Sequence, residues 1–224
     1  MPHVLYDDDD IVVVDKPAGL PVHPVPGRGG ASLCGELVKL YPEMRGVGSL
    51  ERSGVVHRLD IETSGVMVFA RNRSSYLFLR REFENHSRVG KTYLAVLHGA
   101  PEPRKGTLET QLARRADKKR MRVVDSGGQT ALTHWEVLSR QGPLSLVEFR
   151  IETGRTHQIR VHAAHLGHPI VGDAVYGDAV RDARLRRRPS RMLLHAVELA
   201  FAHPSGGGRV VFSAEVPPEL VYAG

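Results

Sequence analysis

Short runs of apolar residues along the chain predict a protein built mainly from β-strands. Ile11–Val14 is a short buried strand, and Lys91–His98 alternates so that Tyr93, Ala95 and Leu97 share one face. Further strands are predicted around 131–138, 144–151, 193–202 and 210–216.

A polar loop separates two of the apolar runs. Val55-Val56 precedes it and Val66–Ala70 follows it, while Ser64-Gly65 closes it. The pattern predicts a strand, a loop over residues 57–65 and a second strand.

Two helices are predicted from their capping residues. Ser32 can cap a helix whose leucines recur at core-facing spacing until Pro42 ends it. Asn72 can cap a second helix, in which apolar residues repeat from Tyr76 to Phe83.

A third helix is predicted from His157 to Leu166. Thr156 stands at its N-cap, and Gly167 stands where a left-handed C-terminal cap would fall. Arg160 lies one position round from the buried face of this helix.

The order of these elements favours an α+β fold, because many strands are mixed with few helices. Residues 101–130 are polar and are predicted to be irregular. No internal repeat or linker divides the chain, so we expect one domain over residues 1–224.

Composition narrows the class of partner. Hydrophobic residues make up 41% of the 224 residues and charged residues 25%, as is typical of globular proteins. Lys and Arg exceed Asp and Glu by 31 to 25, which favours a polyanionic partner. The one cysteine, Cys34, excludes an internal disulfide and a cysteine-based zinc cluster. No apolar run reaches the roughly 20 residues that span a bilayer, and the N-terminal segment is acidic, so we predict a cytoplasmic protein with no membrane partner.

Asp60 is the first candidate for chemistry. It lies in the polar loop, two residues after Arg58, where a nucleophile or general base would be held at the mouth of a core. Arg58 or Arg160 could keep it ionised. The alternative is that its side chain only caps the turn.

Two other kinds of site are disfavoured by spacing. His157, His162, His165 and His168 are separated by steps of five and three residues, whereas zinc-binding helices favour steps of four, so we predict no metal site. Ser64 lacks the G-x-S-x-G context of a serine nucleophile.

Basic residues gather in two segments, 101–122 and 181–191. Arginine and lysine clusters in loops are suited to phosphates, although each could also be a solvated surface. The candidates for contact with phosphates are Arg114, Arg115, Lys118, Lys119, Arg120, Arg186, Arg187 and Arg188.

The sequence resembles the RluA-type pseudouridine synthases. The matching segments occur in the family's order and span nearly the whole chain. They are 15–19 (DKPAG), 57–65 (HRLDIETSG), 91–99 (KTYLAVLHG), 153–162 (TGRTHQIRVH), 167–173 (GHPIVGD) and 193–196 (LLHA).

The resemblance implies a role for individual residues. Asp60 matches the catalytic aspartate, and Tyr93 matches the tyrosine that stacks on the target base and is a candidate acceptor for the proton from carbon 5. Arg160 matches the arginine that pairs with the aspartate, and Arg58 matches a residue that helps displace the base and binds phosphate. Other substrate-binding candidates lie in the matched segments: His57, Thr63, Lys91, Arg155 and His157.

The implied reaction isomerises a uridine within RNA, by base flipping and without any cofactor. The implied fold is a long, mixed and mainly antiparallel sheet with flanking helices and loops and a central cleft. Many relatives carry a small N-terminal RNA-binding domain. Only ten residues precede Ile11 here, so we expect the catalytic domain alone.

Two alternatives remain at this point. One is an RNA-binding or RNA-folding protein without catalysis, and the other is an enzyme acting on a free nucleoside or nucleotide. The joint presence of Asp60, Tyr93 and Arg160 argues against the first, and the basic segments argue against the second. We expect ribosomal or transfer RNA as the partner, and a monomer, because no exposed apolar stripe stands out.

Overall fold

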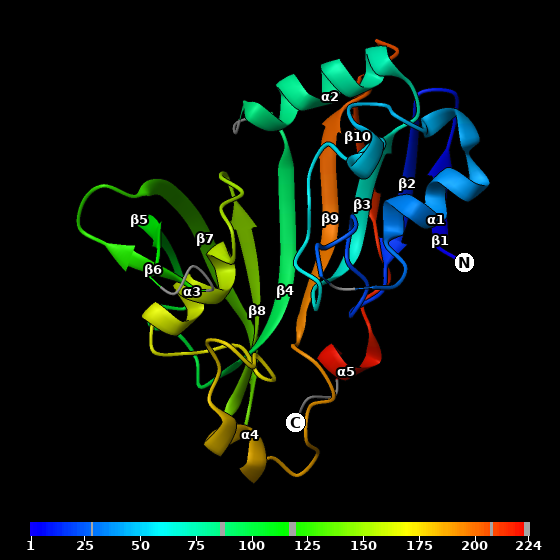
Figure 1. Cartoon of the computed structure of the whole chain (residues 1–224). Coiled ribbons are helices and arrows are strands. Elements are labelled where there is room, and N and C mark those ends of the chain that lie inside the picture. The colour runs from blue at the N-terminus through cyan, green and yellow to red at the C-terminus, as the bar shows by residue number, and fades with distance from the viewer. Residues whose placement is uncertain (28, 86–87, 117–119, 207, 222–224) are drawn as a thin grey trace. The chain divides into compact units, whose positions relative to one another are not determined.

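The protein is represented by a computed structural model that describes residues 1–27, 29–85, 88–116, 120–206 and 208–221 (Figure 1). These residues form two compact units. Unit 1 comprises Met1–Gly90 and Ala196–Glu215, and unit 2 comprises Lys91–His195 and the chain from Val216 onward.

Unit 1 is a sheet with helices beside it. Its strands are β1 (His3–Asp7), β2 (Ile11–Lys16), β3 (Ser64–Ala70), most of β9 (Leu194–Ala202) and β10 (Arg209–Ser213). Its helices are α1 (Leu33–Leu40) and α2 (Arg73–Glu84), with short 3-10 turns at Pro42–Met44 and Leu50–Arg52. The strand order is β1-β2-β3-β9, with β10 on β9, and β1–β2, β2–β3 and β9–β10 pair antiparallel.

The core of unit 1 is built on β2 and β3. Every residue of Ile11–Val14 is fully buried, and β3 is buried along its whole length. A strand without alternation is covered on both faces. Leu79 of α2 and Phe201 of β9 pack into the same core. Because Lys16 pairs with Gly65, the end of β2 lies beside the start of β3.

The two N-terminal helices begin as predicted. The Ser32 side chain accepts a hydrogen bond from the Gly35 N–H at 3.3 Å, and the Asn72 side chain accepts one from the Ser75 N–H at 2.9 Å. Both are N-cap bonds that satisfy a backbone donor left free by the first turn.

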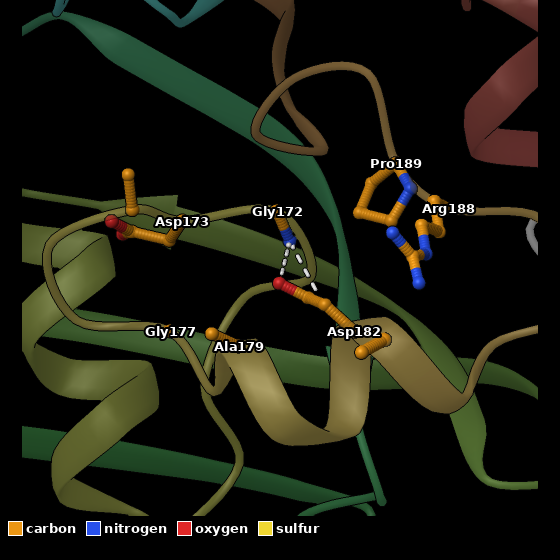
Figure 2. A pocket seen from close by; sticks show the side chains of 9 residues that line it. Gly172, Asp173, Gly177, Ala179, Asp182, Arg188 and Pro189 are labelled. Carbon is orange, nitrogen blue, oxygen red and sulfur yellow. Dashed lines mark hydrogen bonds between the residues drawn. The ribbon is translucent and has the colours of Figure 1, made fainter.

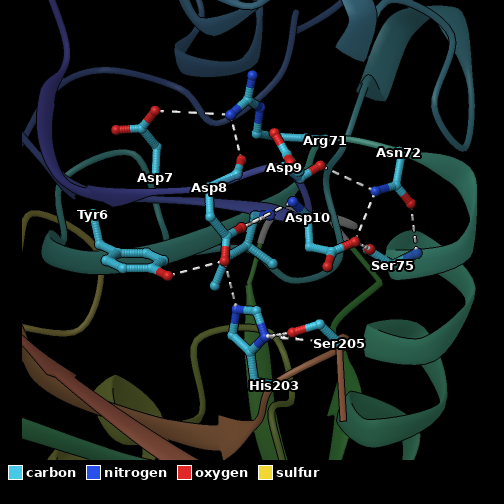
Figure 3. Close-up of polar contacts among 11 residues, drawn as sticks. Tyr6, Asp7, Asp8, Asp9, Asp10, Arg71, Asn72, Ser75, His203 and Ser205 are labelled. Carbon is cyan, nitrogen blue, oxygen red and sulfur yellow. Dashed lines mark hydrogen bonds and ion pairs between the residues drawn. The ribbon is translucent and has the colours of Figure 1, made fainter. Parts of the chain in front are cut away.

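The acidic run Asp7–Asp10 is more than a solvated loop (Figure 3). The Asp8 carboxylate accepts bonds from the backbone N–H of Asp10 and Ile11, both at 2.8 Å, and lies 3.0 Å from Nε2 of His203. Burial alone would raise the pKa of Asp8, but these backbone donors hold it below its ordinary value. Asn72 Nδ2 donates to the Asp10 carboxylate at 2.8 Å, so the run also fastens the start of α2.

Unit 2 is built on antiparallel strands. Its strands are most of β4 (Gly90–His98), β5 (Lys105–Arg114), β6 (Met121–Val124), β7 (Gln129–Gln141) and β8 (Leu144–Ile151), in the order β4-β8-β7-β5-β6. All four neighbouring pairs are antiparallel. The helices are α3 (Gln158–His165), α4 (Ala179–Arg184) and α5 (Pro218–Val221).

The prediction that residues 101–130 are irregular is wrong, because β5 and β6 lie there. β5 contains few large apolar residues, so its sequence carries little strand signal. Its place is fixed by its partners: Gly106 stands opposite Trp135 of β7, and a Cβ at Gly106 would lie 2.2 Å from the indole ring. Leu112 of β5 and Val161 of α3 share a buried cluster with Met121.

α3 begins one residue later than predicted, and Thr156 does not cap it. His157 stands at the N-cap with a left-handed backbone (φ 56°) and makes no side-chain cap bond. The buried Gln158 side chain accepts a bond from the Arg155 N–H at 3.0 Å instead. The C-terminal cap is confirmed, since Gly167 is left-handed (φ 81°) and closes the helix with the bond pair of a Schellman motif.

The predicted α+β class with mainly antiparallel strands is confirmed. None of the helices in the part of the chain that the structure describes has the length and apolar character needed to cross a membrane.

Candidate active site

The loop that carries Asp60 joins a short bridge to β3 in unit 1. Val55 makes a single bridge to Phe69, so the strand predicted at Val55-Val56 is reduced to that one contact. The Thr63 N–H donates to the Asp60 carbonyl at 3.2 Å and closes a turn. The Asp60 side chain is half-buried, and Arg58 is exposed.

A buried lysine fixes this loop from the end of β2. Lys16 is completely buried, and its ammonium donates to the carbonyls of Pro17 at 2.8 Å, Leu20 at 2.9 Å and Ile61 at 2.9 Å. The Gly19 N–H donates to the same Ile61 carbonyl at 2.8 Å. Asp60 is therefore next to a backbone group held by two donors, one of them charged.

His57 and Thr63 lie inward at the two ends of the loop. The His57 ring stacks on Phe83 of α2, with 4.5 Å between the ring centroids, and its Nε2 accepts a bond from the Val68 N–H at 3.1 Å. Thr63 is buried. These contacts bind the loop to β3 and α2. Among the candidate residues of this loop, Arg58 is the exposed one.

Tyr93 and Lys91 share one face of β4 in unit 2. Tyr93 stands opposite Phe149 of β8, which stands opposite Trp135 of β7, so three aromatic side chains form a row across the sheet. Both Tyr93 and Lys91 are only 9% exposed.

The Lys91 ammonium donates to the Glu152 carbonyl at 3.1 Å. Burial, together with the charge of Arg155, lowers the pKa of Lys91 to about 8, against the opposing charge of Glu152. Lys91 is thus a buried cation that loses its proton more readily than an ordinary lysine.

Arg160 is clamped by Asp173. Its Nε and Nη2 each donate to one carboxylate oxygen at 2.7 Å, and the Asp173 side chain is fully buried. The carboxylate also accepts bonds from the N–H groups of Val175 and Tyr176. Burial would raise the pKa of Asp173, but the bonds and charge of Arg160 hold it below its ordinary value. This bidentate geometry leaves the guanidinium little freedom to rotate.

Tyr176 joins Arg160 to His157. The Arg160 guanidinium lies 5.1 Å from the centroid of the Tyr176 ring, a cation–π distance. The Tyr176 hydroxyl accepts a bond from the Met121 N–H at 2.8 Å and is 2.9 Å from Nδ1 of His157. Arg155 Nε donates to the Thr130 carbonyl at 2.9 Å.

The polar residues of α3 form a buried network. His162 is fully buried between the hydroxyls of Thr110 at 2.8 Å and Thr133 at 2.9 Å. Burial lowers its pKa to about 4, so the ring is neutral at physiological pH. Gln158 bonds to Thr133 and Thr153 in the same network.

The four clustered histidines play separate parts. His168 Nδ1 bonds to the His98 carbonyl at 3.0 Å, while His165 is exposed. No group of three or more His, Cys, Asp or Glu side chains within the described ranges is arranged to hold a metal ion.

Six of the predicted RNA-binding residues are described by the structure, and they are exposed in two places in unit 2. Arg114, Arg115 and Arg120 lie at the tip of the β5–β6 hairpin, where the Arg115 N–H donates to the Arg120 carbonyl at 2.7 Å. Lys118 and Lys119 lie outside the described residues. Arg186, Arg187 and Arg188 lie in the loop after α4.

Sequence reasoning gave no role to Lys16, Asp173 or Tyr176. Lys16 carried a signal, since it ends a strand that begins with the apolar run Ile11–Val14, and a buried ammonium must be hydrogen-bonded. Asp173 and Tyr176 reach Arg160 through a loop whose course no local pattern specifies.

The chain belongs to the RNA pseudouridylate synthase family: a family model of that description matches residues 10–165. The predicted RluA-type pseudouridine synthase, an enzyme that isomerises uridine in RNA, is thereby confirmed.

Relatives carry the same family name. The chain is 42% identical over 222 residues to an uncharacterized RNA pseudouridine synthase of Mycobacterium bovis, covering 98% of this chain and 71% of the relative. It is 40% identical over 227 residues to ribosomal large subunit pseudouridine synthase D of Neisseria meningitidis, covering 98% of this chain and 59% of that protein. The solved structure of human RNA pseudouridylate synthase domain containing 4 is similar, with a TM-score of 0.77, 28% identity, and coverage of 98% of this chain and 90% of that one.

Proposed function

We propose that Asp60, Tyr93 and Arg160 carry the isomerisation of uridine to pseudouridine in ribosomal or transfer RNA. The observation that carries this proposal is the Asp60 loop, whose backbone is fixed at the neighbouring Ile61 by buried Lys16. A rigid carboxylate is what a nucleophile or base needs, because misplacement by even an ångström is costly in rate.

The reaction breaks the bond between ribose and ring nitrogen 1 and forms a carbon–carbon bond at carbon 5. The proton leaves carbon 5, nitrogen 1 gains one, and no atom is added overall. Asp60 could attack the ring, attack the sugar or take the 2′ proton of ribose, and each route starts from an ionised carboxylate. Tyr93 is proposed to stack on the flipped uracil and to accept the carbon-5 proton.

Arg160 is proposed to supply positive charge in the active site. The resemblance implies that it pairs with Asp60, and that pairing stays a prediction. Its support within unit 2 is the clamp by Asp173, which holds the guanidinium in one orientation.

Arg58, His57, Thr63, Lys91, Arg155 and His157 are proposed to bind or to shape the substrate site. We also propose that residues 1–224 work as one monomeric catalytic domain. The cytoplasmic location stays a prediction.

The direct test is release of carbon-5 tritium from labelled RNA. We expect the wild type to release tritium and Asp60→Asn to release none. Glu62→Gln is the matched control, because Glu62 is an exposed carboxylate in the same loop. Release by Asp60→Asn would contradict the assignment, and no release by the wild type from either kind of RNA would favour a binding protein without catalysis.

The class of RNA is tested in the same assay. Relatives named for the large ribosomal subunit make ribosomal RNA the first substrate to try, and transfer RNA the second. Activity on uridine monophosphate alone would instead support an enzyme of free nucleotides.

The two basic surfaces are tested by charge reversal. Arg115→Glu or Arg187→Glu should weaken RNA binding. The plot of log affinity against log salt concentration should also become less steep, by about one unit of slope for each phosphate that is no longer bound. Unchanged affinity and slope would remove that surface from the RNA-binding site.

A further inference from the structure

Unit 2 has a surface cavity to which no role has been given as a whole, although two of its lining residues, Asp173 and Arg188, are described above. Its volume is about 330 Å³, and it lies between α4 and the loop that follows it (Figure 2). Small residues between Gly172 and Ala183 line one side, and the side chains of Arg188 and Pro189 line the other.

Hydrogen bonds of the half-buried Asp182 side chain hold the walls of the cavity together. The Asp182 carboxylate of α4 accepts bonds from the Gly172 N–H at 3.2 and 3.3 Å and lies 2.8 Å from His98 Nε2. Asp178 caps the helix through the N–H groups of Val180 and Arg181. A site held in this way is formed before a ligand arrives, which lowers the entropic cost of binding.

An exposed arginine gives the cavity one place where a phosphate could bind. Both of its carboxylates are already engaged, Asp173 by Arg160 and Asp182 by the Gly172 N–H and His98. Arg188 is exposed at the cavity, and the exposed Arg186 and Arg187 precede it in the same loop.

The size and lining suit one nucleotide. The volume is at the lower end of the range for small-molecule pockets, too small for a duplex. Unpaired bases of RNA are commonly stacked on aromatic side chains or on arginine planes, and arginine also binds phosphate.

We propose that this cavity binds one unpaired nucleotide of the substrate RNA, other than the target uridine. Arg188 binds its phosphate, and its base lies between Pro189 and the alanines of α4. The proposal rests on the proposed function, because it takes the substrate to be RNA. Since Asp173 both lines the cavity and holds Arg160, this nucleotide is bound directly beside the arginine clamp.

The first test fills the cavity without changing charge. Ala183→Phe places a ring in it, and Val180→Phe adds the same ring to the same helix outside the cavity, at a side chain that is already 63% exposed. Binding of labelled ribosomal and transfer RNA is measured on filters, with thermal unfolding as a check on folding. We expect Ala183→Phe to weaken binding about tenfold and Val180→Phe to bind as the wild type does.

The second test removes one charge inside or outside the cavity. Arg188→Ala should lose clearly more affinity than Arg187→Ala, its exposed neighbour. Equal losses in these two variants, or wild-type affinity in a folded Ala183→Phe, overturn the proposal. Should Ala183→Phe fail to fold, the arginine pair decides alone.

A third arm identifies the source of the nucleotide. Adenosine and uridine 5′-monophosphates are added to the protein without RNA, and thermal unfolding is followed. Stabilisation of the wild type that disappears in Ala183→Phe, together with equal RNA binding by these two proteins, would assign the cavity to a free nucleotide and overturn the proposal. Failure of the proposed function is distinct, since the wild type would then release no tritium from any RNA.

Discussion

Replacing Asp173 by asparagine tests whether the orientation of Arg160 matters for catalysis. The substitution preserves size but removes the charge that holds Nε and Nη2 at 2.7 Å each. An asparagine can accept one of these bonds only, because its amide nitrogen is a donor that would face the other guanidinium N–H. Arg160, only 8% exposed, would keep its charge without that counter-ion.

The expected effect of Asp173→Asn on stability follows from the two hydrogen bonds that are broken or weakened. Hydrogen bonds to charged groups contribute about 1.5–3 kcal/mol each, and breaking a buried ion pair costs about 3–5 kcal/mol. We therefore expect the free energy of unfolding to fall by about 3 kcal/mol. If about 2 kcal/mol of orienting energy is also removed from the transition state, the single-turnover rate falls about 30-fold.

The assay is tritium release in a single turnover with enzyme in excess over RNA. RNA affinity is measured separately on filters, and the folded fraction is taken from urea unfolding. A residue that only stabilises the fold would lower the folded fraction and leave the rate of each folded molecule unchanged. Asp125→Asn is the matched control, since Asp125 is an exposed aspartate of the same unit. A rate per folded molecule within twofold of the wild type would refute the reasoning.

Three further predictions concern buried ionisable groups. The pKa of His162 is about 4 in the folded protein and about 6.5 in the unfolded chain, so the unfolded chain binds more protons between these values. When the pH is lowered from 7 to 5, the free energy of unfolding should therefore fall by about 2 kcal/mol more in the wild type than in His162→Gln, as measured by urea unfolding. The pKa of Lys91 is about 8 in the folded protein and about 10.4 in the unfolded chain, so stability should rise with pH. Between about pH 7.5 and 9.5, the free energy of unfolding of the wild type should rise by about 2 kcal/mol relative to Lys91→Met, measured in the same way. Lys16→Met should lower the free energy of unfolding by about 3 kcal/mol and reduce tritium release. The reason is that the carbonyls of Pro17, Leu20 and Ile61 lose the donor that they share. An unchanged melting temperature would contradict this prediction.

Three of the four predicted helix caps were correct, because their chemistry is local, whereas Thr156 is not a cap. Ser32, Asn72 and Gly167 each act on backbone groups within a few residues, so the sequence alone is sufficient to identify them. The buried strands β2 and β3 were predictable for a similar reason, since an unbroken apolar run has few other solutions.

The parts that sequence missed depend on partners distant along the chain. β5 has few large apolar residues and is held by β6 and β7, so its polar sequence was interpreted as irregular. The clamp on Arg160 depends on where the loop after α3 brings Asp173, thirteen residues later. α3 also breaks the usual pattern, because Gln158 and His162 are buried polar residues that only a tertiary network can satisfy.

The ammonium of Lys16 does for the Asp60 loop what a coordinated cation does in many other loops. It draws carbonyl oxygens from three separate points of the chain onto one positive centre. Being covalently attached, this centre cannot dissociate, be chelated or be exchanged for another ion. The geometry around Asp60 is thus encoded in a side chain, and it is present as soon as β2 has folded against β3.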